Sequence, residues 1–122
     1  MAKYLLPESV VQQDGIGDVM ALDAGRGKPL QLTLGITRIV ELESLEVSVW
    51  GSPDGRNWKL LQTFPRKGYC GTYTVILDLT RYREVRHLRA QWKMSRWGAG
   101  EITPLFGFYL LAEETTLRPV PA

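Results

Sequence analysis

Hydrophobic and polar residues alternate along most of this chain, and this period of two constrains the fold more than any other feature. Such segments run from Leu30 to Ile36, from Leu45 to Val49, from Tyr73 to Leu79 and from Leu88 to Met94. Because successive side chains of a β-strand point to opposite faces, each segment is predicted to be a strand with one face toward a core. The sequence therefore predicts an all-β protein.

Clusters of Gly, Pro, Asp and Asn separate these segments, as turns do in antiparallel sheets. The clearest is the turn at 51–57, in which proline fixes one φ angle and Asp54-Gly55 supplies a residue that tolerates positive φ. Trp58 is expected to return to the core directly after this turn. The stretch from Leu79 to Val85 is expected to form one short helical turn. Short strands at this spacing indicate an antiparallel β-sandwich or jelly roll.

The length of 122 residues fits one domain over 1–122. We expect its core to span about 18–112, and 115–122 to form a flexible tail. Before residue 29 the pattern is weaker, with short strands expected only near Val10 and Met20. The segment 105–112 is apolar at both its odd and its even positions. This is typical of a strand that is covered on both faces or that lies at a subunit contact.

Composition narrows the class of protein. With 44% hydrophobic and 23% charged residues, the chain is an ordinary globular one. It has no apolar stretch of the roughly 18 residues that a membrane helix needs, and its N-terminal apolar run is too short for a signal peptide. Cys70 is the only cysteine, so an intramolecular disulfide is impossible and a cytoplasmic location is expected.

Charge is distributed unevenly along the chain. Residues 1–50 carry 4 Lys/Arg against 7 Asp/Glu, and 51–122 carry 11 against 6, which gives net charges of −3 and +5. Basic and aromatic residues interleave in the second half, as nucleic-acid binding requires; they are Arg81, Tyr82, Arg83, Arg86, Arg89, Trp92, Lys93, Arg96 and Trp97. Glu41, Glu43 and Glu46 can face these cations across strands, so a solvated sheet face is the favoured interpretation and nucleic-acid binding the less favoured one.

Catalytic and metal-binding motifs are missing from the sequence. His87 is the only histidine, and neither a second cysteine nor a Gly-rich phosphate loop is present. A Cys70–His87 nucleophile pair stays open, because sequence distance does not exclude it. We expect a protein that is not an enzyme and that needs no cofactor, while a structural calcium stays open.

Tyr69, Arg96 and Trp97 are the predicted ligand-binding residues. Both aromatic residues lie in or beside predicted loops, and loops on a rigid sandwich are where binding usually takes place. Sugar C–H faces stack on such rings, and Arg96 can hydrogen-bond hydroxyls or a carboxylate. These residues predict a module that binds a carbohydrate or a protein through its end loops.

An alternative function is a structural subunit of a larger, phage-like assembly. Such a homo-oligomer would associate through Phe106, Phe108 and Leu110 of the apolar last strand, or through an exposed sheet edge.

Two motifs resemble those of discoidin domains, the coagulation-factor type C modules. The run Leu45 to Trp58 is similar to their strand followed by Ser-x-Asp-Gly-x-x-Trp. Val85 to Ala90 is similar to their strand in which an aromatic residue or Val is followed by Arg, Tyr, Leu or Ile, and Arg. The resemblance covers about 18–112 and implies a galactose-binding-like jelly roll whose end loops bind sugars, phospholipids or proteins. The chain looks closer to small bacterial or phage-associated variants of that fold than to the extracellular members, and no ligand residue carries over from the resemblance.

Overall fold

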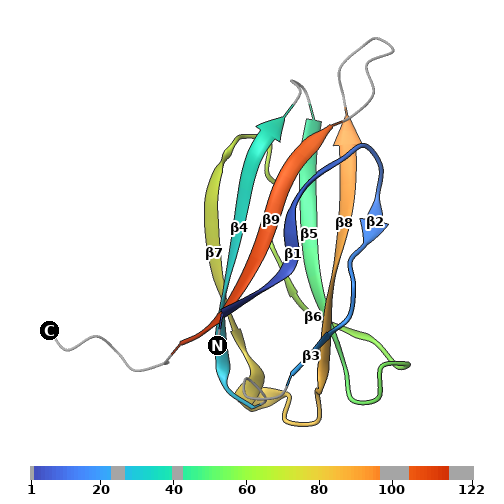
Figure 1. Ribbon diagram of the computed structural model, residues 1–122, viewed down its shortest axis with the longest axis vertical. Coiled ribbons are helices and arrows are strands. Elements are labelled where there is room, and N and C mark those ends of the chain that lie inside the picture. Colours follow the sequence, from blue (N-terminus) through green and yellow to red (C-terminus); the bar gives the residue numbers. More distant parts are fainter. Residues whose placement is uncertain (1, 23–26, 40–42, 97–104, 116–122) are drawn as a thin grey trace, which may run out of the picture.

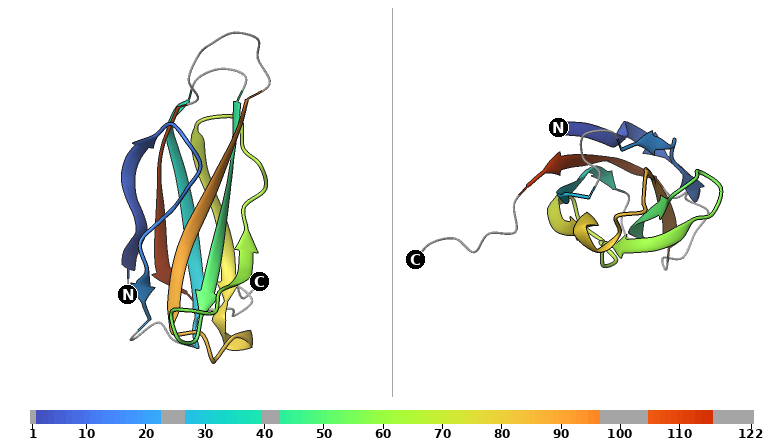
Figure 2. Two further views of the ribbon diagram at one scale, coloured as in Figure 1. Left: turned by 90° about the vertical axis from the view of Figure 1, so that its right-hand side faces the viewer. Right: turned by 90° about the horizontal axis from the view of Figure 1, so that it is seen from below.

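The computed structural model describes residues 2–22, 27–39, 43–96 and 105–115, and it confirms an antiparallel β-sandwich (Figures 1 and 2). The first sheet has the order β1-β9-β4-β7 and consists of β1 (Ala2–Val11), β4 (Pro29–Ile39), β7 (Gly71–Asp78) and β9 (Phe106–Glu114). The second has the order β2-β8-β5-β6 and consists of β2 (Gly15–Ile16), β5 (Glu43–Ser52), β6 (Lys59–Thr63) and β8 (His87–Arg96); β3 (Met20–Ala21) also pairs with β8. Trp97 and 116–122 of the expected tail lie outside the described residues.

The core lies between the two sheets and is made of the alternating residues. The residues that carry the alternation are at most 3% exposed; they are Leu30, Leu32, Leu34, Ile36, Leu45, Val47, Val49, Leu77, Leu79, Leu88 and Ala90. Their polar neighbours in sequence point to the outer faces of the sheets. The period of two therefore located the inner face of four strands correctly.

The last strand has a fully buried inner face, whereas Tyr109 and Leu111 on its outer face are only partly buried. Strand β9 lies between β1 and β4 in the first sheet. Phe106, Phe108 and Leu110 are 0%, 2% and 0% exposed, because they face the second sheet. These three residues are therefore not available as the self-association surface that the alternative function would use.

Strand β1 is the element that the sequence shows least clearly. It is paired with β9 from Ala2 to Val11, ahead of the expected start of the core at about 18, and Leu5 is buried in the core. Its pairing shifts register between Tyr4 and Leu6 and again between Leu6 and Ser9. Each shift breaks the period of two, which explains why alternation does not reveal this strand.

The turn that joins β5 to β6 forms where it is predicted. Gly55 has a φ of 77°, which only glycine adopts without strain. The side chain of Ser52 accepts hydrogen bonds from the Asp54 and Gly55 N–H groups at 3.2 and 2.8 Å. Trp58 was expected in the core, and this is wrong, because its ring is only partly buried and lies against Arg89 on the outer face of the second sheet.

The helical turn expected after Asp78 is also present, as the 3₁₀ helix η1 (Leu79–Arg81). The Asp78 carboxylate caps it by accepting a hydrogen bond from the Thr80 N–H at 3.1 Å. Leu79 is buried, so the turn closes the lower end of the core. Within the part of the chain that the structure describes, no helix is long and apolar enough to cross a membrane.

Candidate functional site

One end of the sandwich carries the candidate site. We call it the loop end: it comprises the connections 12–14 and 64–70 together with the adjoining ends of β4 and β8, and it is uppermost in Figure 1. The ends of sandwich sheets are where loops from separate strands gather and can contact a ligand.

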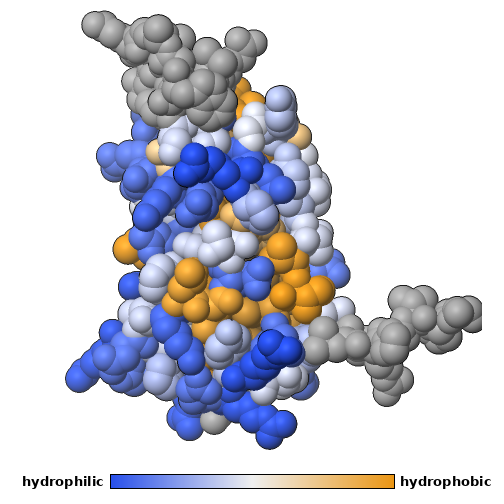
Figure 3. All heavy atoms as spheres, turned by 180° about the vertical axis from the view of Figure 1, so that it is seen from behind, coloured by the Kyte–Doolittle hydropathy of each residue, from blue (hydrophilic) through white to orange (hydrophobic). Residues whose placement is uncertain are grey.

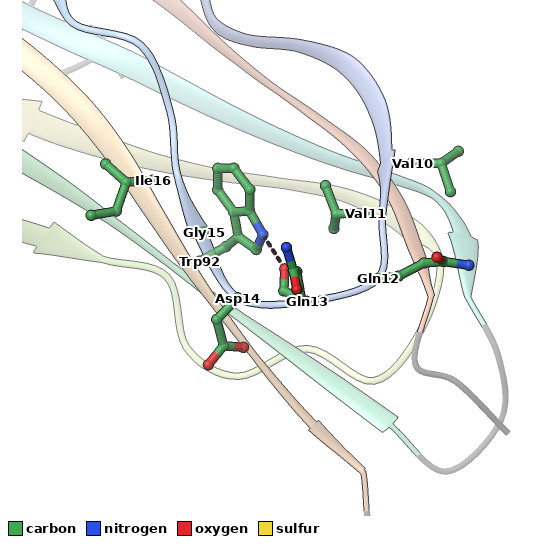
Figure 4. Close-up of a pocket in the computed structure, with 8 residues that line it drawn as sticks. All are labelled: Val10, Val11, Gln12, Gln13, Asp14, Gly15, Ile16 and Trp92. Carbon is green, nitrogen blue, oxygen red and sulfur yellow. Dashed lines mark hydrogen bonds between the residues drawn. The ribbon is translucent and has the colours of Figure 1, made fainter. Parts of the chain in front are cut away.

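A hollow opens at the loop end where the chain bends from β1 into β2. Its volume is about 540 Å³, within the range of small-molecule sites. The bend itself forms most of the lining, and one aromatic ring from β8 completes it; the lining residues are Val10, Val11, Gln12, Gln13, Asp14, Gly15, Ile16 and Trp92. In Figure 4, Trp92, Val11 and Gln13 lie inside the bend, whereas Gln12 and Asp14 project from its outer side.

Two hydrogen bonds hold the bend against β8. The Trp92 Nε1–H donates to the Gln13 carbonyl oxygen at 2.9 Å, and the Met94 N–H donates to the Asp14 carboxylate at 2.7 Å. The wall of the hollow is therefore fixed to a central strand, so the shape of the hollow is set by the fold itself.

Close packing fixes the Trp92 ring as well. Trp92 packs edge-on against Phe108 of the core, with ring centroids 5.7 Å apart. On the other side, Gly15 lies so close that a Cβ atom there would stand 2.4 Å from the Trp92 ring. Glycine is required at this position because no side chain fits between the bend and the indole.

The rim of the hollow has both hydrophobic and polar side chains. Val10 and Ile16 are 50% and 54% exposed. The amides of Gln12 and Gln13 supply both donors and acceptors beside them. This combination suits a ligand with one apolar face and several hydroxyl groups.

Tyr69 stands on the other side of the loop end. Its side chain is 80% exposed, yet its loop is well anchored. Lys67 and Leu45 exchange two backbone hydrogen bonds of 2.8 and 2.9 Å, and the Tyr73 hydroxyl donates to the Tyr69 carbonyl oxygen at 2.9 Å. Tyr69 is therefore an exposed aromatic ring on a fixed support.

The predicted site residues are not joined into one pocket. Tyr69 lies in the connection to β7, and the hollow lies beside β1 and β2, which are at the opposite edges of the two sheets. Arg96 ends β8 at the loop end, opposite Glu43 of β5. Trp97 and the Arg96 side chain lie outside the part of the chain that the structure describes, so their contribution stays a prediction.

Two basic residues of β8 have partners on the outer face of the second sheet. Arg89 stacks on Trp58 with 4.2 Å between its guanidinium carbon and the ring centroid, and Lys93 lies directly opposite Glu46. Glu43 differs from expectation, because it is 1% exposed and its carboxylate accepts a hydrogen bond from the Leu105 N–H at 3.2 Å. These contacts favour a solvated sheet face over a nucleic-acid groove.

Cys70 and His87 do not form a pair. Cys70 is exposed at the loop end, next to Gly71, which pairs with Ile36 near the top of β4. His87 pairs with Ser52 at the other end of the sandwich. Over residues 2–22, 27–39, 43–96 and 105–115, no group of three or more His, Cys, Asp or Glu side chains could hold a metal ion.

Sequence reasoning missed the hollow, because 10–16 reads only as a weak strand followed by an Asp-Gly turn. Only the fold brings this segment to Trp92, which lies 77 positions beyond Gly15 in the chain and directly opposite it across the β2–β8 pair. Comparison of the sequence with protein-family models and with curated proteins gave no match, so the similarity to discoidin domains stays a prediction.

Proposed function

We propose that this protein is a non-catalytic binding module and that a carbohydrate occupies the hollow at the loop end. The observation that carries the proposal is the fixed Trp92 ring, which lines a hollow of about 540 Å³. The side-chain amide of Gln13 lies inside the same bend of the chain. A sugar has apolar C–H faces that pack on an indole and hydroxyls that exchange hydrogen bonds with amides.

Exposed hydrophobic groups at the rim add to this support. Val10 and Ile16 stay half in water in the free protein, so covering them on binding contributes favourably. A protein ligand is the alternative, and it would be expected to extend from the hollow toward Tyr69. Nucleic-acid binding receives less support, because Arg89 and Lys93 already face Trp58 and Glu46.

The test is a glycan-array screen followed by titration of the best glycan into two single variants. Gln13→Ala removes the side-chain amide inside the bend, while the backbone carbonyl that holds Trp92 stays in place. Tyr69→Ala is the matched control, since it removes an exposed side chain on the other side of the loop end. We expect at least tenfold weaker binding for Gln13→Ala, about 1.4 kcal/mol, and unchanged binding for Tyr69→Ala.

Weaker glycan binding for Tyr69→Ala together with unchanged binding for Gln13→Ala would contradict the proposed site in the hollow. The ligand would then be assigned to the Tyr69 loop. Absence of glycan binding by the unsubstituted protein, together with capture of a protein that Gln13→Ala abolishes, would replace the carbohydrate by a protein ligand.

We also propose a cytoplasmic location. Cys70 is exposed and is the only cysteine of the chain, and an unpaired surface thiol persists best in a reducing compartment. Rapid alkylation of Cys70 in freshly lysed cells, before any reductant is added, is the expected result. A thiol that is already blocked by a mixed disulfide would contradict this location.

A further inference from the structure

The edges of the two sheets differ in how well they are protected against pairing with another strand. Edge strands of monomeric proteins are usually short, bulged, or interrupted by charged residues or proline. Strand β1 carries Lys3, Pro7 and Glu8 and shifts register twice along its pairing with β9. Strands β2 and β3 have two residues each, and β6 has five and begins with Lys59.

Strand β7 has none of these protections. It is eight residues long and pairs with β4 at every position from Gly71 to Asp78 without a register shift. No charged residue and no proline occurs between Gly71 and Leu77, and Thr, Tyr, Val and Ile, which favour strands, occupy the middle. Among the described strands β7 pairs with β4 alone, so one side of its backbone has no strand partner.

We propose that β7 pairs with β7 of a second copy of this chain. The two strands run antiparallel about a twofold axis normal to the sheet, so the first sheets of both copies join into one continuous sheet, β1-β9-β4-β7 followed by β7-β4-β9-β1. This inference does not depend on the proposed carbohydrate site, which lies at the opposite sheet edges.

The twofold axis determines which side chains of the two β7 strands lie opposite each other. Outer side chains must meet outer side chains, and Thr72, Thr74 and Ile76 are the exposed residues of β7. Centring the axis on Thr74 places Thr74 opposite its own copy and Thr72 opposite Ile76. On the inner face, Tyr73 then meets Val75. All these contacts join uncharged residues, many of them β-branched, which stabilise cross-strand pairs.

Self-complementarity of the edge favours a second copy as the occupant. No charged residue lies between Gly71 and Leu77, and the Asp78 carboxylate at the end of β7 lies 3.6 Å from Arg81 Nε of its own chain. Antiparallel pairing about the twofold axis therefore sets no two like charges of β7 against each other, and it forms each cross-strand contact twice. A second copy therefore matches the edge in length and polarity.

The surface on this side of the sandwich is also hydrophobic. Strands β6 and β7 lie on the side away from β1 (Figure 2), and Figure 3 shows hydrophobic residues gathered below the middle of that side. Leu60 of β6 and Ile76 of β7 are 50% and 41% exposed. Pairing of the β7 edges covers part of this surface, which adds apolar burial to the backbone hydrogen bonds.

The test uses charge at the centre of the proposed contact, with the molar mass measured by analytical ultracentrifugation. We expect the unsubstituted protein to dimerise, and Thr74→Lys and Thr74→Glu each to be monomeric, because two like charges then face each other. An equimolar mixture of these two variants is expected to form a heterodimer, which also shows that both variants are folded. The control Thr33→Lys places the same charge on the same outer face of β4, and it is expected to stay dimeric.

A monomeric unsubstituted protein would overturn the proposal. So would a Thr74→Lys variant that dimerises as well as the parent, or a Thr33→Lys variant that dissociates as fully as Thr74→Lys. These results leave the glycan-binding experiment untouched, since Gln13 and Tyr69 are not altered.

Cys70 gives an independent measure of the register. As the only cysteine, it accepts one spin label in each copy. With Thr74 at the centre, position 70 faces position 78 of the other copy, so the two labels are separated by about 26 Å along the strands, at roughly 3.3 Å per residue. A label distance below about 15 Å, or no dipolar coupling at all, would exclude this pairing.

Discussion

The guanidinium of Arg89 lies 4.2 Å from the centre of the Trp58 ring, on the outer face of the second sheet. This stack explains two departures from the expected pattern. Trp58 stays outside the core because Arg89 covers part of its apolar face, and Arg89 is engaged within the chain although it lies on the basic strand. Contacts of this kind are worth about 0.5–1 kcal/mol at exposed sites.

A double-mutant cycle at these two residues measures the stack. Arg89→Ala and Trp58→Ala should each lower the free energy of unfolding, and the double variant should lower it by less than the sum. The coupling energy is expected to be about 0.5–1 kcal/mol in urea denaturation. A coupling energy of zero would show that the two side chains stabilise the fold independently, contrary to the observed geometry.

The close approach of Gly15 to Trp92 predicts unequal effects of two glycine substitutions. Gly15→Ala places a Cβ 2.4 Å from the rigid indole ring, which Phe108 and the Gln13 carbonyl hold in place. Gly17→Ala meets only the end of the flexible Leu6 side chain, also at 2.4 Å. We expect Gly15→Ala to cost about 1–3 kcal/mol and Gly17→Ala clearly less. Equal costs would mean that Trp92 is free to move, and the hollow would not be preformed.

Alternation was a reliable guide where strands are regular and have one buried face. The segments around Leu32, Val47, Val75 and Leu88 follow it without interruption, and all are strands with the expected inner faces. It failed for β1, because register shifts move successive residues to unexpected faces. It also could not place Trp58, since a ring beside a turn can cover either face and its partner Arg89 is distant in sequence.

The candidate site was harder to predict than the fold, because its parts are joined only by strand pairing. The exposure of Tyr69 was predicted from its place in a Gly- and Pro-rich connection, and it is confirmed, whereas its role in binding stays a prediction. The hollow depends on Gly15 meeting Trp92 and on the Asp14 carboxylate meeting the Met94 N–H, two long-range contacts with no local signature. An Asp-Gly pair signals a turn whether or not a tryptophan lies beneath it.

Asp54 makes stability depend on pH in a defined direction. Hydrogen bonds from the Asn57 and Arg56 N–H groups, at 2.9 and 2.8 Å, hold the pKa of the Asp54 carboxyl well below its ordinary value of 3.8. A carboxyl whose pKa is lower in the folded state than in the unfolded state stabilises the fold. This stabilisation is complete above the pKa of the unfolded state, and it is lost as the pH falls through the pKa of the folded state.

Asp54→Asn should therefore destabilise the protein at neutral pH, and the difference from the parent should shrink steadily below about pH 4. Urea denaturation at pH 6 and at about pH 2.5 checks this. Asp18→Asn removes one negative charge at another exposed position and serves as the control. A gap between Asp54→Asn and parent that is equal at both pH values would show that the carboxylate is not what stabilises the turn.

Phe108 distinguishes the buried last strand from a subunit contact. The side chain is 2% exposed and packs edge-on against Trp92, so Phe108→Ala leaves a cavity between the sheets and removes a support of the hollow. We expect a loss of about 3–5 kcal/mol in the free energy of unfolding, with any dimer unchanged as long as the chain stays folded. Leu60→Ala, at a position that is 50% exposed, should cost far less. If Phe108→Ala instead abolished self-association while stability stayed the same, this residue would have to lie at a subunit contact, and the two sheets could not pack as they do in the structure.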